Sequence, residues 1–415
     1  MRGIQQRDSS TSKKEIIVFL DSHRKYKNGC RDLFIDFRTL DDYQVFQKVL
    51  ESNLSNSMPS YIHLKSVKIK QRLEFDTYYH LNVNELKRLK ESDELVFNLE
   101  EDSYVIGGHY IFDKEAEYND ILEKCSPQEL EEFQVEEFNN NGLSFISQNS
   151  LVAQQIEDPV IYVADVGQAN WNELRDGDTT VLVFDCGSPL NSKKNVTDVI
   201  WNKHQQRLKK RPSTLVISHW DIDHYHCLID RSVQDLKSCF KSVFCPHAVS
   251  NTSLKVYGSL KRIFDDVFVE VPSFVQDFKH LTWPPMKFQM RSHNVALYKG
   301  TSGNSINHSG LAIFIEGNNK TAIFSGDLRI GQCHEVRKQE NISKPHVLIV
   351  PHHGGFCGKT SLTIHYPIDT AIISVGINNS YGHPNKDVID YLKVISNNTI
   401  KRTDILGRDI EEKLS

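Results

Sequence analysis

Six consecutive residues, His219-Trp220-Asp221-Ile222-Asp223-His224, constrain the fold of this chain more than any other segment. They contain four side chains that can bind metal, and they directly follow the apolar run Leu215-Val216-Ile217-Ser218. A buried strand that ends in a tight loop would bring all four side chains to one point. Imidazole nitrogens and carboxylate oxygens together suit Zn²⁺, Mn²⁺ or iron. The segment therefore predicts a metal site at the end of a buried strand, and a solvated polar loop is the alternative.

The length and composition are those of a two-domain globular protein. The chain has 415 residues, of which 39% are hydrophobic and 25% charged, as is usual for proteins in water. No run approaches the roughly 20 apolar residues that a membrane helix needs, and the polar first dozen residues lack the apolar segment of a signal peptide. The eight cysteines form no CxxC pair. We therefore expect a cytoplasmic protein with no membrane partner and no cysteine-zinc module.

Charge is divided unevenly along the chain. Residues 1–150 carry 19 Lys and Arg against 27 Asp and Glu, whereas residues 151–415 carry 30 against 27. Bound cations would offset some of the acids of the second part and leave its surface more basic. This asymmetry indicates that only the second part could bind nucleic acid electrostatically.

Residues 1–150 predict a small α+β accessory domain. Strand patterns occur at 14–20, 30–37 and 61–75, and helical patterns at 41–53, 84–92 and the acidic stretch 114–138. A breaker, Asn139-Asn140-Asn141-Gly142, follows. Residues 148–158 then have the composition of a linker.

Residues 151–415 predict an α/β domain. Short apolar runs recur at 160–166, 180–185, 215–218, 311–316, 321–325, 347–350 and 370–375, and residues 193–211 form a basic helical stretch. Each run ends in a polar or glycine-rich loop. Loops that follow strands and meet at one sheet edge are how α/β enzymes build a site.

Those loops carry an ordered set of motifs. They are Asp165-Val166-Gly167-Gln168, Asp185-Cys186-Gly187, the opening segment, Asn307-His308-Ser309, Ser325-Gly326-Asp327, Pro351-His352-His353-Gly354, Tyr381-Gly382-His383-Pro384, and Arg402-Thr403-Asp404 with Gly407. In this order, residues 160 to about 410 resemble the metallo-β-lactamase superfamily. Within it they are most similar to the β-lactamase-like domain of the DNA-uptake protein ComEC and its soluble relatives. The resemblance implies an αββα sandwich with a dinuclear metal site along one edge.

The resemblance also implies roles for single residues. It implies two divalent metal ions, Mn²⁺ or Zn²⁺. Most superfamily members have a second histidine where Asp221 stands, and ComEC-like members often have aspartate, which makes the site harder and favours Mn²⁺. The implied ligands are His219, Asp221 and His308 for the first ion, Asp223, His224 and His383 for the second, and Asp327 as a bridge between both.

Other residues are expected to act around the metals. Asp223 is expected to accept a proton, and His352 and His353 to protonate a leaving group or bind phosphate. Adjacent residues of an extended chain point in different directions, so we expect only one of these histidines to reach a metal. Residues expected to support the site or contact the substrate are Asp165, Gln168, Asp185, Trp220, Asn379 and Tyr381.

The chain departs from the family pattern at a few positions without losing an implied ligand. Ala169 replaces a glycine, and Tyr225-His226-Cys227 replaces an apolar-Gly-Gly segment. We expect His226 to be a packing or surface residue. The basic end of the helical stretch, up to Arg211, is expected to be a solvated face, and a path for phosphates is the alternative.

The expected function is metal-dependent hydrolysis. Two metal ions activate a water molecule and stabilise developing charge, and the resemblance to ComEC indicates a nuclease or phosphodiesterase acting on nucleic acid, above all DNA. With its additional domain, which would bind a protein partner or regulate access, the chain would fit an effector of bacterial anti-phage defence or DNA processing. One alternative is a small-molecule hydrolase acting on a lactone, thioester or cyclic nucleotide, since the fold alone does not choose. Another is a non-catalytic interaction protein with a structural metal site.

Overall fold

The computed structural model describes residues 15–25, 30–37, 40–50, 61–69, 73–74, 77–91, 96–100, 109–117, 121–126, 128–129, 149–189, 192, 194–229, 231–246, 251–272, 285–301, 307–355, 357, 368–379, 381–396 and 399–415. The chain forms two compact units. An N-terminal unit consists of residues 1–100 and 108–125, and a C-terminal unit of residues 101–107 and 126–415.

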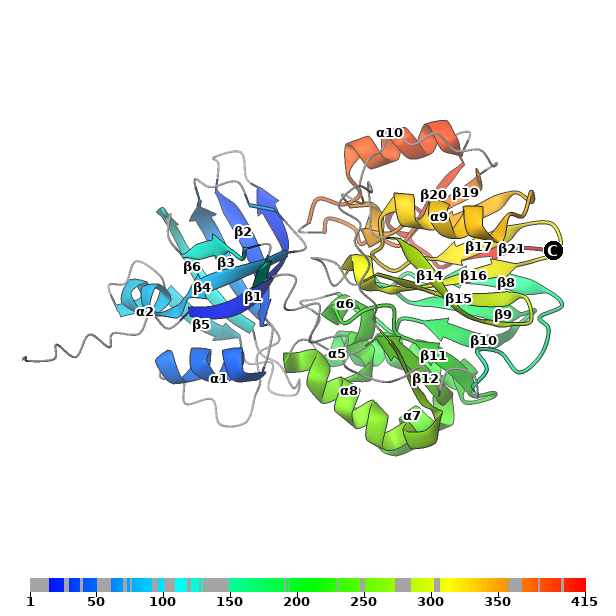
Figure 1. The fold of residues 1–415 in the computed structure, drawn as a ribbon, viewed down its shortest axis with the longest axis horizontal. Coiled ribbons are helices and arrows are strands. Elements are labelled where there is room, and N and C mark those ends of the chain that lie inside the picture. Colours follow the sequence, from blue (N-terminus) through cyan, green and yellow to red (C-terminus); the bar gives the residue numbers. More distant parts are fainter. Residues whose placement is uncertain are drawn as a thin grey trace, which may run out of the picture. The chain divides into compact units, whose positions relative to one another are not determined.

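The N-terminal unit is built on one seven-stranded sheet, shown in blue and cyan in Figure 1. Its strands, in spatial order, are β5 (Val96–Glu100), β6 (His109–Glu117), β3 (Tyr61–Lys68), β2 (Arg31–Phe37), β1 (Glu15–Lys25), β4 (Thr77–Asn82) and β7 (Leu122–Lys124). Among the described strands of this sheet, β3 and β6 pair in parallel and the other pairs are antiparallel. Two helices, α1 (Leu40–Val49) and α2 (Val83–Glu91), add Phe46, Leu86 and Leu89 to the same core as the strands.

One prediction for this unit is wrong. The acidic stretch 114–138 was expected to be helical, but residues 114–117 belong to β6 and residues 122–124 form β7. β6 is hydrogen-bonded on both sides, to β3 and to β5, and this pairing overrides the helical preference of its Lys, Glu and Ala residues. Residues 118–120 and 130–138, and the breaker at 139–142, lie outside the described residues.

The C-terminal unit contains two seven-stranded mixed sheets. The first has the order β13 (Phe268–Val271), β12 (Phe240–Pro246), β11 (Ser213–Val216), β10 (Thr179–Phe184), β9 (Asn172–Asp176), β8 (Pro159–Val163) and β21 (Ile410–Lys413). The second has the order β14 (Met286–Ser292), β15 (Val295–Gly300), β16 (Leu311–Glu316), β17 (Thr321–Phe324), β18 (His346–Ile349), β19 (Ile368–Ile373) and β20 (Ile400–Arg402).

The two sheets repeat one pairing pattern. In the first sheet, β10 pairs antiparallel with β9 on one side and parallel with β11 on the other, and β12 and β13 extend the parallel part. In the second, β17 pairs antiparallel with β16 and parallel with β18, and β19 and β20 extend the parallel part. Because parallel strands share one carboxyl edge, the loops after β10 and β11 lie together, and so do the loops after β17 and β18.

Apolar contacts hold these sheets face to face. Side chains of both sheets share one buried cluster, in which the rings of Phe184 and Phe324 lie 5.5 Å apart at the ends of β10 and β17. Helices cover the outer faces (Figure 1), with α5 (Lys194–Leu208), α7 (Val233–Cys239) and α8 (Asn251–Phe264) on the first sheet and α9 (Ile330–Glu340) and α10 (Lys386–Ile395) on the second. Short helices that the structure describes in this unit include α6 (Ile222–Tyr225), α11 (Thr403–Leu406) and 3₁₀ turns at His226–Leu228, Asp265–Val267, Asn307–Ser309 and His352–Gly354.

The mixed α/β class predicted for this part of the chain is confirmed, and each predicted strand run corresponds to a strand. The predicted linker at 148–158 is not one. Leu151, Val152 and Ile156 are buried in the core between the two sheets, and the backbone N–H of Ile156 donates to Asn294. The segment is ordered because its few apolar side chains are buried between the two sheets.

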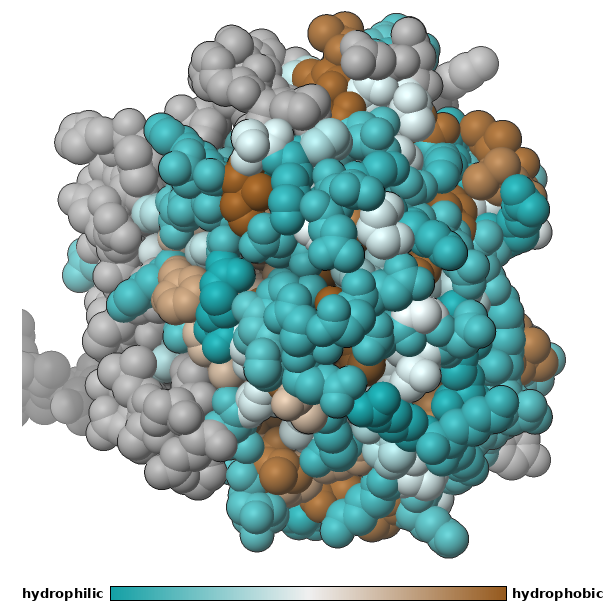
Figure 2. Space-filling model, turned by 90° about the vertical axis from the view of Figure 1, so that its right-hand side faces the viewer, coloured by the Kyte–Doolittle hydropathy of each residue, from teal (hydrophilic) through white to brown (hydrophobic). Residues whose placement is uncertain are grey.

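The face of the C-terminal unit near the C terminus is mostly hydrophilic, with hydrophobic residues in small separate groups (Figure 2). No helix within the described part of the chain is long and apolar enough to cross a membrane.

Candidate metal centre

The opening motif lies at the carboxyl end of β11. All residues of this strand are buried, and the chain leaves it through Ile217 and Ser218 before α6 begins at Ile222. His219 and Asp221 therefore lie in the loop, while Asp223 and His224 lie in the short helix. The tight turn brings the rings of His219 and His224 to 4.0 Å from each other.

A first group of potential metal ligands consists of His219, His224 and Asp327. The Nε2 atom of His224 is 3.2 Å from Oδ1 of Asp327, and the Nε2 atom of His219 is 3.9 Å from Oδ2. All three side chains are at most 4% exposed. The two Nε2 atoms and Oδ1 of Asp327 are buried and have no hydrogen-bond partner among the described residues. Buried polar atoms are normally paired, so three such atoms facing one another fit a bound cation.

A second group consists of Asp223, His224 and His353. The Nε2 atom of His353 is 3.1 Å from Oδ2 of Asp223, and the Nε2 atom of His224 is 3.7 Å from Oδ1. Nδ1 of His353 lies 2.9 Å from the carbonyl of Ser374, which can only accept, so the Nδ1 proton points away from the site. His224 is common to both groups, which places the two groups side by side.

Charges within the centre hold the pKa values of its groups far from their usual range. Burial, with a contribution from His224, lowers the pKa of His219 to about 4. Burial would also lower the pKa of His224, but Asp327, Asp185 and Asp223 outweigh it and hold that pKa well above its usual value. Burial would raise the pKa of Asp327, but His224, His352 and His219 hold it well below the usual range. The centre is therefore a set of buried carboxylates that attract positive charge.

The paired histidines both turn towards the centre. His352 and His353 have φ angles of 54° and 52°, so this segment is not the extended chain assumed from the sequence. Nδ1 of His352 lies 3.7 Å from Oδ2 of Asp327, whereas His353 contacts Asp223. His353 belongs to a group of potential ligands and His352 does not.

Three expected ligands lie outside both groups. Asp221 is near the first group, with Oδ2 3.4 Å from Nε2 of His219. His308 has its ring 3.3 Å from Nε of Arg329. The ring of His383 lies 5.5 Å from that of His352 and 5.7 Å from that of Tyr381.

The side chain of Asn379 determines the position of His383 by accepting from its backbone N–H at 3.0 Å and donating to its carbonyl at 2.7 Å. Burial lowers the pKa of His383 to about 3. Tyr381 stacks on the same ring. Asn379 and Tyr381 thus support His383, at the edge of the centre next to His352.

Of the residues expected to support the site, Asp185 contacts a potential ligand, whereas the contacts of Gln168 and Asp165 are with residues outside both groups. Asp185 accepts hydrogen bonds from Ser218 and lies 2.8 Å from Nδ1 of His224. Gln168 accepts from the backbone N–H of Gly376 at 3.4 Å. The backbone N–H of Asp165 donates to Asp409 at 2.9 Å, and burial raises the pKa of Asp165.

Trp220 is a core residue. Its indole N–H donates to the carbonyl of Pro246 at 2.7 Å, and its ring packs edge-on against Tyr225 and Tyr257. Only 1% of the residue is exposed, which leaves no face on which a nucleic-acid base could stack.

The basic end of α5 is at the other end of β11. Lys209, Lys210 and Arg211 precede the strand, whereas the metal-binding motif follows it. Lys209 is also paired with Asp235 at 2.9 Å. This placement supports a solvated face and gives no path for phosphates into the centre.

Sequence reasoning did not identify Ser218 as part of the centre. Its hydroxyl lies within 3.2 Å of Asp185, His219 and His224. The only signal was its position directly before the first histidine of the motif.

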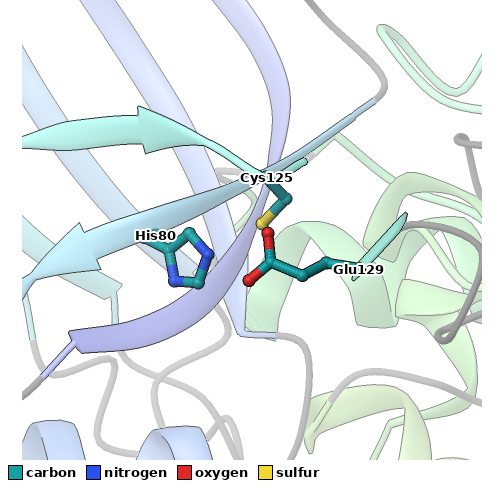
Figure 3. Close-up of side chains that lie close together, drawn as sticks. All are labelled: His80, Cys125 and Glu129. Atoms are coloured by element: carbon teal, nitrogen blue, oxygen red, sulfur yellow. The ribbon is translucent and has the colours of Figure 1, made fainter. Parts of the chain in front are cut away.

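His80 and Cys125 of the N-terminal unit can also bind metal. His80 lies on β4 and Cys125 directly follows β7 (Figure 3). Glu129, also drawn there, belongs to the C-terminal unit and accepts hydrogen bonds from the N–H and hydroxyl of Ser126 at 2.7 and 2.8 Å. Because these residues belong to different units, we assign no site to them.

No protein-family model matches the sequence, and no curated protein matches it either. What the chain can do must therefore be argued from its own residues.

Proposed function

We propose that this chain is a metal-dependent hydrolase of the metallo-β-lactamase superfamily that cleaves phosphodiester bonds, with nucleic acid, above all DNA, as its substrate. One observation carries the proposal. Buried, unpaired ligand atoms of His219, His224 and Asp327 converge from the carboxyl ends of strands in two different sheets. The convergence of several such atoms on one point supports a bound cation, because each buried polar atom left unpaired costs about 1–3 kcal/mol.

The ligands would hold two divalent ions, with His224 bound to only one of them because its Nε2 atom belongs to both groups. The aspartates favour Mn²⁺, while the histidines also admit Zn²⁺. When bound, the ions would supply an activated water and stabilise the charge that develops on phosphorus. The protein's own contribution is positioning. Ser374 holds His353 by its Nδ1 atom so that Nε2 faces Asp223.

Two residues are placed to move protons or hold the substrate. The carboxylate of Asp223 is 21% exposed, so it can receive a proton at the open side of the centre. His352 is 14% exposed and lies beside Asp327, where its imidazole can bind a phosphate oxygen or protonate the leaving oxygen. The preference for nucleic acid over a lactone or thioester comes from the resemblance to ComEC-like domains.

The test is a hydrolysis assay on the full chain loaded with Mn²⁺ or Zn²⁺. We expect cleavage of plasmid, linear or single-stranded DNA or of RNA, and loss of that cleavage in His219→Ala and Asp327→Ala. A matched control is Ser242→Ala, which removes one buried hydroxyl far from the motif loops, on β12. Absence of cleavage of every nucleic acid by the metal-loaded protein would overturn the proposal.

The alternatives give different results in the same assay. A small-molecule hydrolase would hydrolyse a lactone, thioester or cyclic nucleotide and leave nucleic acid intact. A structural metal site would bind metal without turnover on any substrate, including bis-p-nitrophenyl phosphate. We further propose that the N-terminal unit binds a protein partner, as in an effector of defence or DNA processing. Affinity purification of partners with the full chain would test this.

A further inference from the structure

We propose that the hydroxyl of Ser218 is a positioning group that links His219 to the carboxylate of Asp185 and thereby determines which ring nitrogen of His219 faces the metal centre. The inference rests on the proposed function only in treating His219 and His224 as metal ligands. It assigns a role to Ser218, which lies directly before the motif that begins at His219.

Four buried side chains form the linkage. Oδ1 of Asp185 accepts from the backbone N–H of Ser218 at 2.7 Å. Oδ2 lies 2.9 Å from the hydroxyl of Ser218 and 2.8 Å from Nδ1 of His224. The same hydroxyl lies 2.9 Å from Nδ1 of His219 and 3.2 Å from Nδ1 of His224. None of the four residues is more than 1% exposed, so water does not compete for these bonds.

The chemistry of the groups fixes the direction of each hydrogen bond. A carboxylate can only accept, so the single proton of the Ser218 hydroxyl is donated to Asp185. The oxygen of Ser218 can then only accept from Nδ1–H of His219. Nε2 of His219 is left without a proton and faces Asp221 and Asp327 at 3.4 and 3.9 Å. His224 donates from Nδ1 to Asp185 directly.

One carboxylate therefore orients both histidines: it accepts directly from Nδ1 of His224 and, through Ser218, sets the tautomer of His219. This matters because an imidazole binds a cation only through a nitrogen that carries no proton. The backbone of Asp185 has a φ of 66°, a left-handed conformation that aspartate and asparagine adopt more readily than most residues. Its backbone N–H is bonded to the carbonyl of Val216 at 2.8 Å, which keeps the carboxylate beneath the motif.

Two substitutions separate the parts of this linkage. Ser218→Ala removes the bond to His219 and leaves the bond between Asp185 and His224. Asp185→Asn keeps the side-chain shape and the backbone conformation. Its remaining oxygen, Oδ1, can still accept from the backbone N–H of Ser218, which places an amide N–H donor where Oδ2 was. The hydroxyl of Ser218 must then accept from the amide and donate to His219, so the direction reverses and the proton of His219 moves to Nε2.

The experiment is long-range ¹H–¹⁵N spectroscopy of the metal-free full chain with labelled histidines, in which His219→Gln identifies the signal of His219. We expect the Nδ1–H tautomer in the native protein and in the control Ser242→Ala, a mixture in Ser218→Ala and the Nε2–H tautomer in Asp185→Asn. Affinity for Mn²⁺ and Zn²⁺, measured by equilibrium dialysis, should fall about 10- to 100-fold in both site variants and stay unchanged in the control.

The proposal is overturned if His219 of the native protein carries its proton on Nε2, or if its tautomer is the same in Ser218→Ala as in the native protein. If one variant fails to fold, the other still tests the linkage. Because the tautomer is read without metal or substrate, a failure of nucleic-acid cleavage would overturn the proposed function and leave this inference standing.

Discussion

The Nε2 atom of His224 lies 3.2 Å from Oδ1 of Asp327, although the two residues follow strands of different sheets. Neither atom has a hydrogen-bond partner among the described residues. The carboxylate after β17 thus completes a group of ligands that begins after β11, and the two halves of the unit meet at this point. Replacing Asp327 should remove the contact between the two groups of loops without disturbing either sheet.

We predict that Asp327→Asn binds metal at least about tenfold more weakly than the native protein. Loss of a residue that only supports a ligand already lowers affinity about 10- to 100-fold, and Asp327 faces the ion directly. Metal analysis after dialysis, together with hydrolysis of bis-p-nitrophenyl phosphate, measures the change. The control is Asp235→Asn, which removes an exposed carboxylate paired with Lys209. Full metal content in Asp327→Asn would contradict the assignment of the centre.

Removal of metal should lower the thermal stability of the chain. A ligand present at 100 times its Kd stabilises the folded state by about 2.7 kcal/mol, which for a unit of this size corresponds to roughly 4 °C in Tm. Thermal unfolding with and without a chelator measures the difference. Asp327→Asn should show a much smaller difference, and equal effects of the chelator on both proteins would place the stabilising ion elsewhere.

The sequence predicted those strands whose apolar pattern matches their burial in the fold. The strand β11 was expected because its apolar run is buried on both faces. The strand β9 was not, since Asn172–Asp176 reads as a polar segment. Its Glu173 is fully buried and accepts from Arg175 at 3.0 Å and from the hydroxyl of Thr180 at 2.7 Å. A second positive charge comes from Arg207 on α5, whose Nε lies 3.2 Å from Glu173, and no pattern local to β9 shows that this residue helps to neutralise the glutamate.

The candidate site shows the same limit. The ordered motifs predicted which loops contribute, because carboxyl ends of parallel strands meet at one edge. They did not predict which of the histidines contribute to a group of potential metal ligands. His353 reaches Asp223 because two successive residues adopt left-handed backbone conformations, while His383 stacks on Tyr381 instead. Backbone conformation at such positions depends on packing from distant strands, which a motif does not contain.

We predict that His226→Asn makes the stability of the protein less sensitive to acid. Burial lowers the pKa of His226 from 6.5 to about 4, so below pH 6.5 the unfolded chain binds a proton that the native state does not. The free energy of unfolding therefore falls as the pH drops from 6.5 towards 4, and this group contributes about 2 kcal/mol between pH 6.5 and 5. An asparagine amide can still donate towards the carbonyl of Pro189, which lies 3.2 Å from Nδ1 of His226.

Urea unfolding at pH 7.5 and pH 5 tests this prediction. The native protein should lose more stability than His226→Asn between the two pH values. His293→Asn is the control, because His293 is exposed, and its loss of stability should equal that of the native protein. An equal loss in all three proteins would show that His226 accepts a proton in the folded state.

We predict that Gly326→Ala destabilises the protein and also weakens metal binding. Gly326 precedes Asp327 and has a φ of 50°, and an added Cβ would lie 2.6 Å from the hydroxyl oxygen of Ser218. The matched control is Gly177→Ala, where φ is 55° and nothing lies within 4 Å of the added Cβ. Both substitutions carry the left-handed penalty of about 1–2 kcal/mol, and the contact with Ser218 should add about 1–3 kcal/mol. Urea unfolding and Mn²⁺ affinity should therefore separate the two variants, and equal metal affinity in both would show that the spacing between Gly326 and Ser218 does not position Asp327.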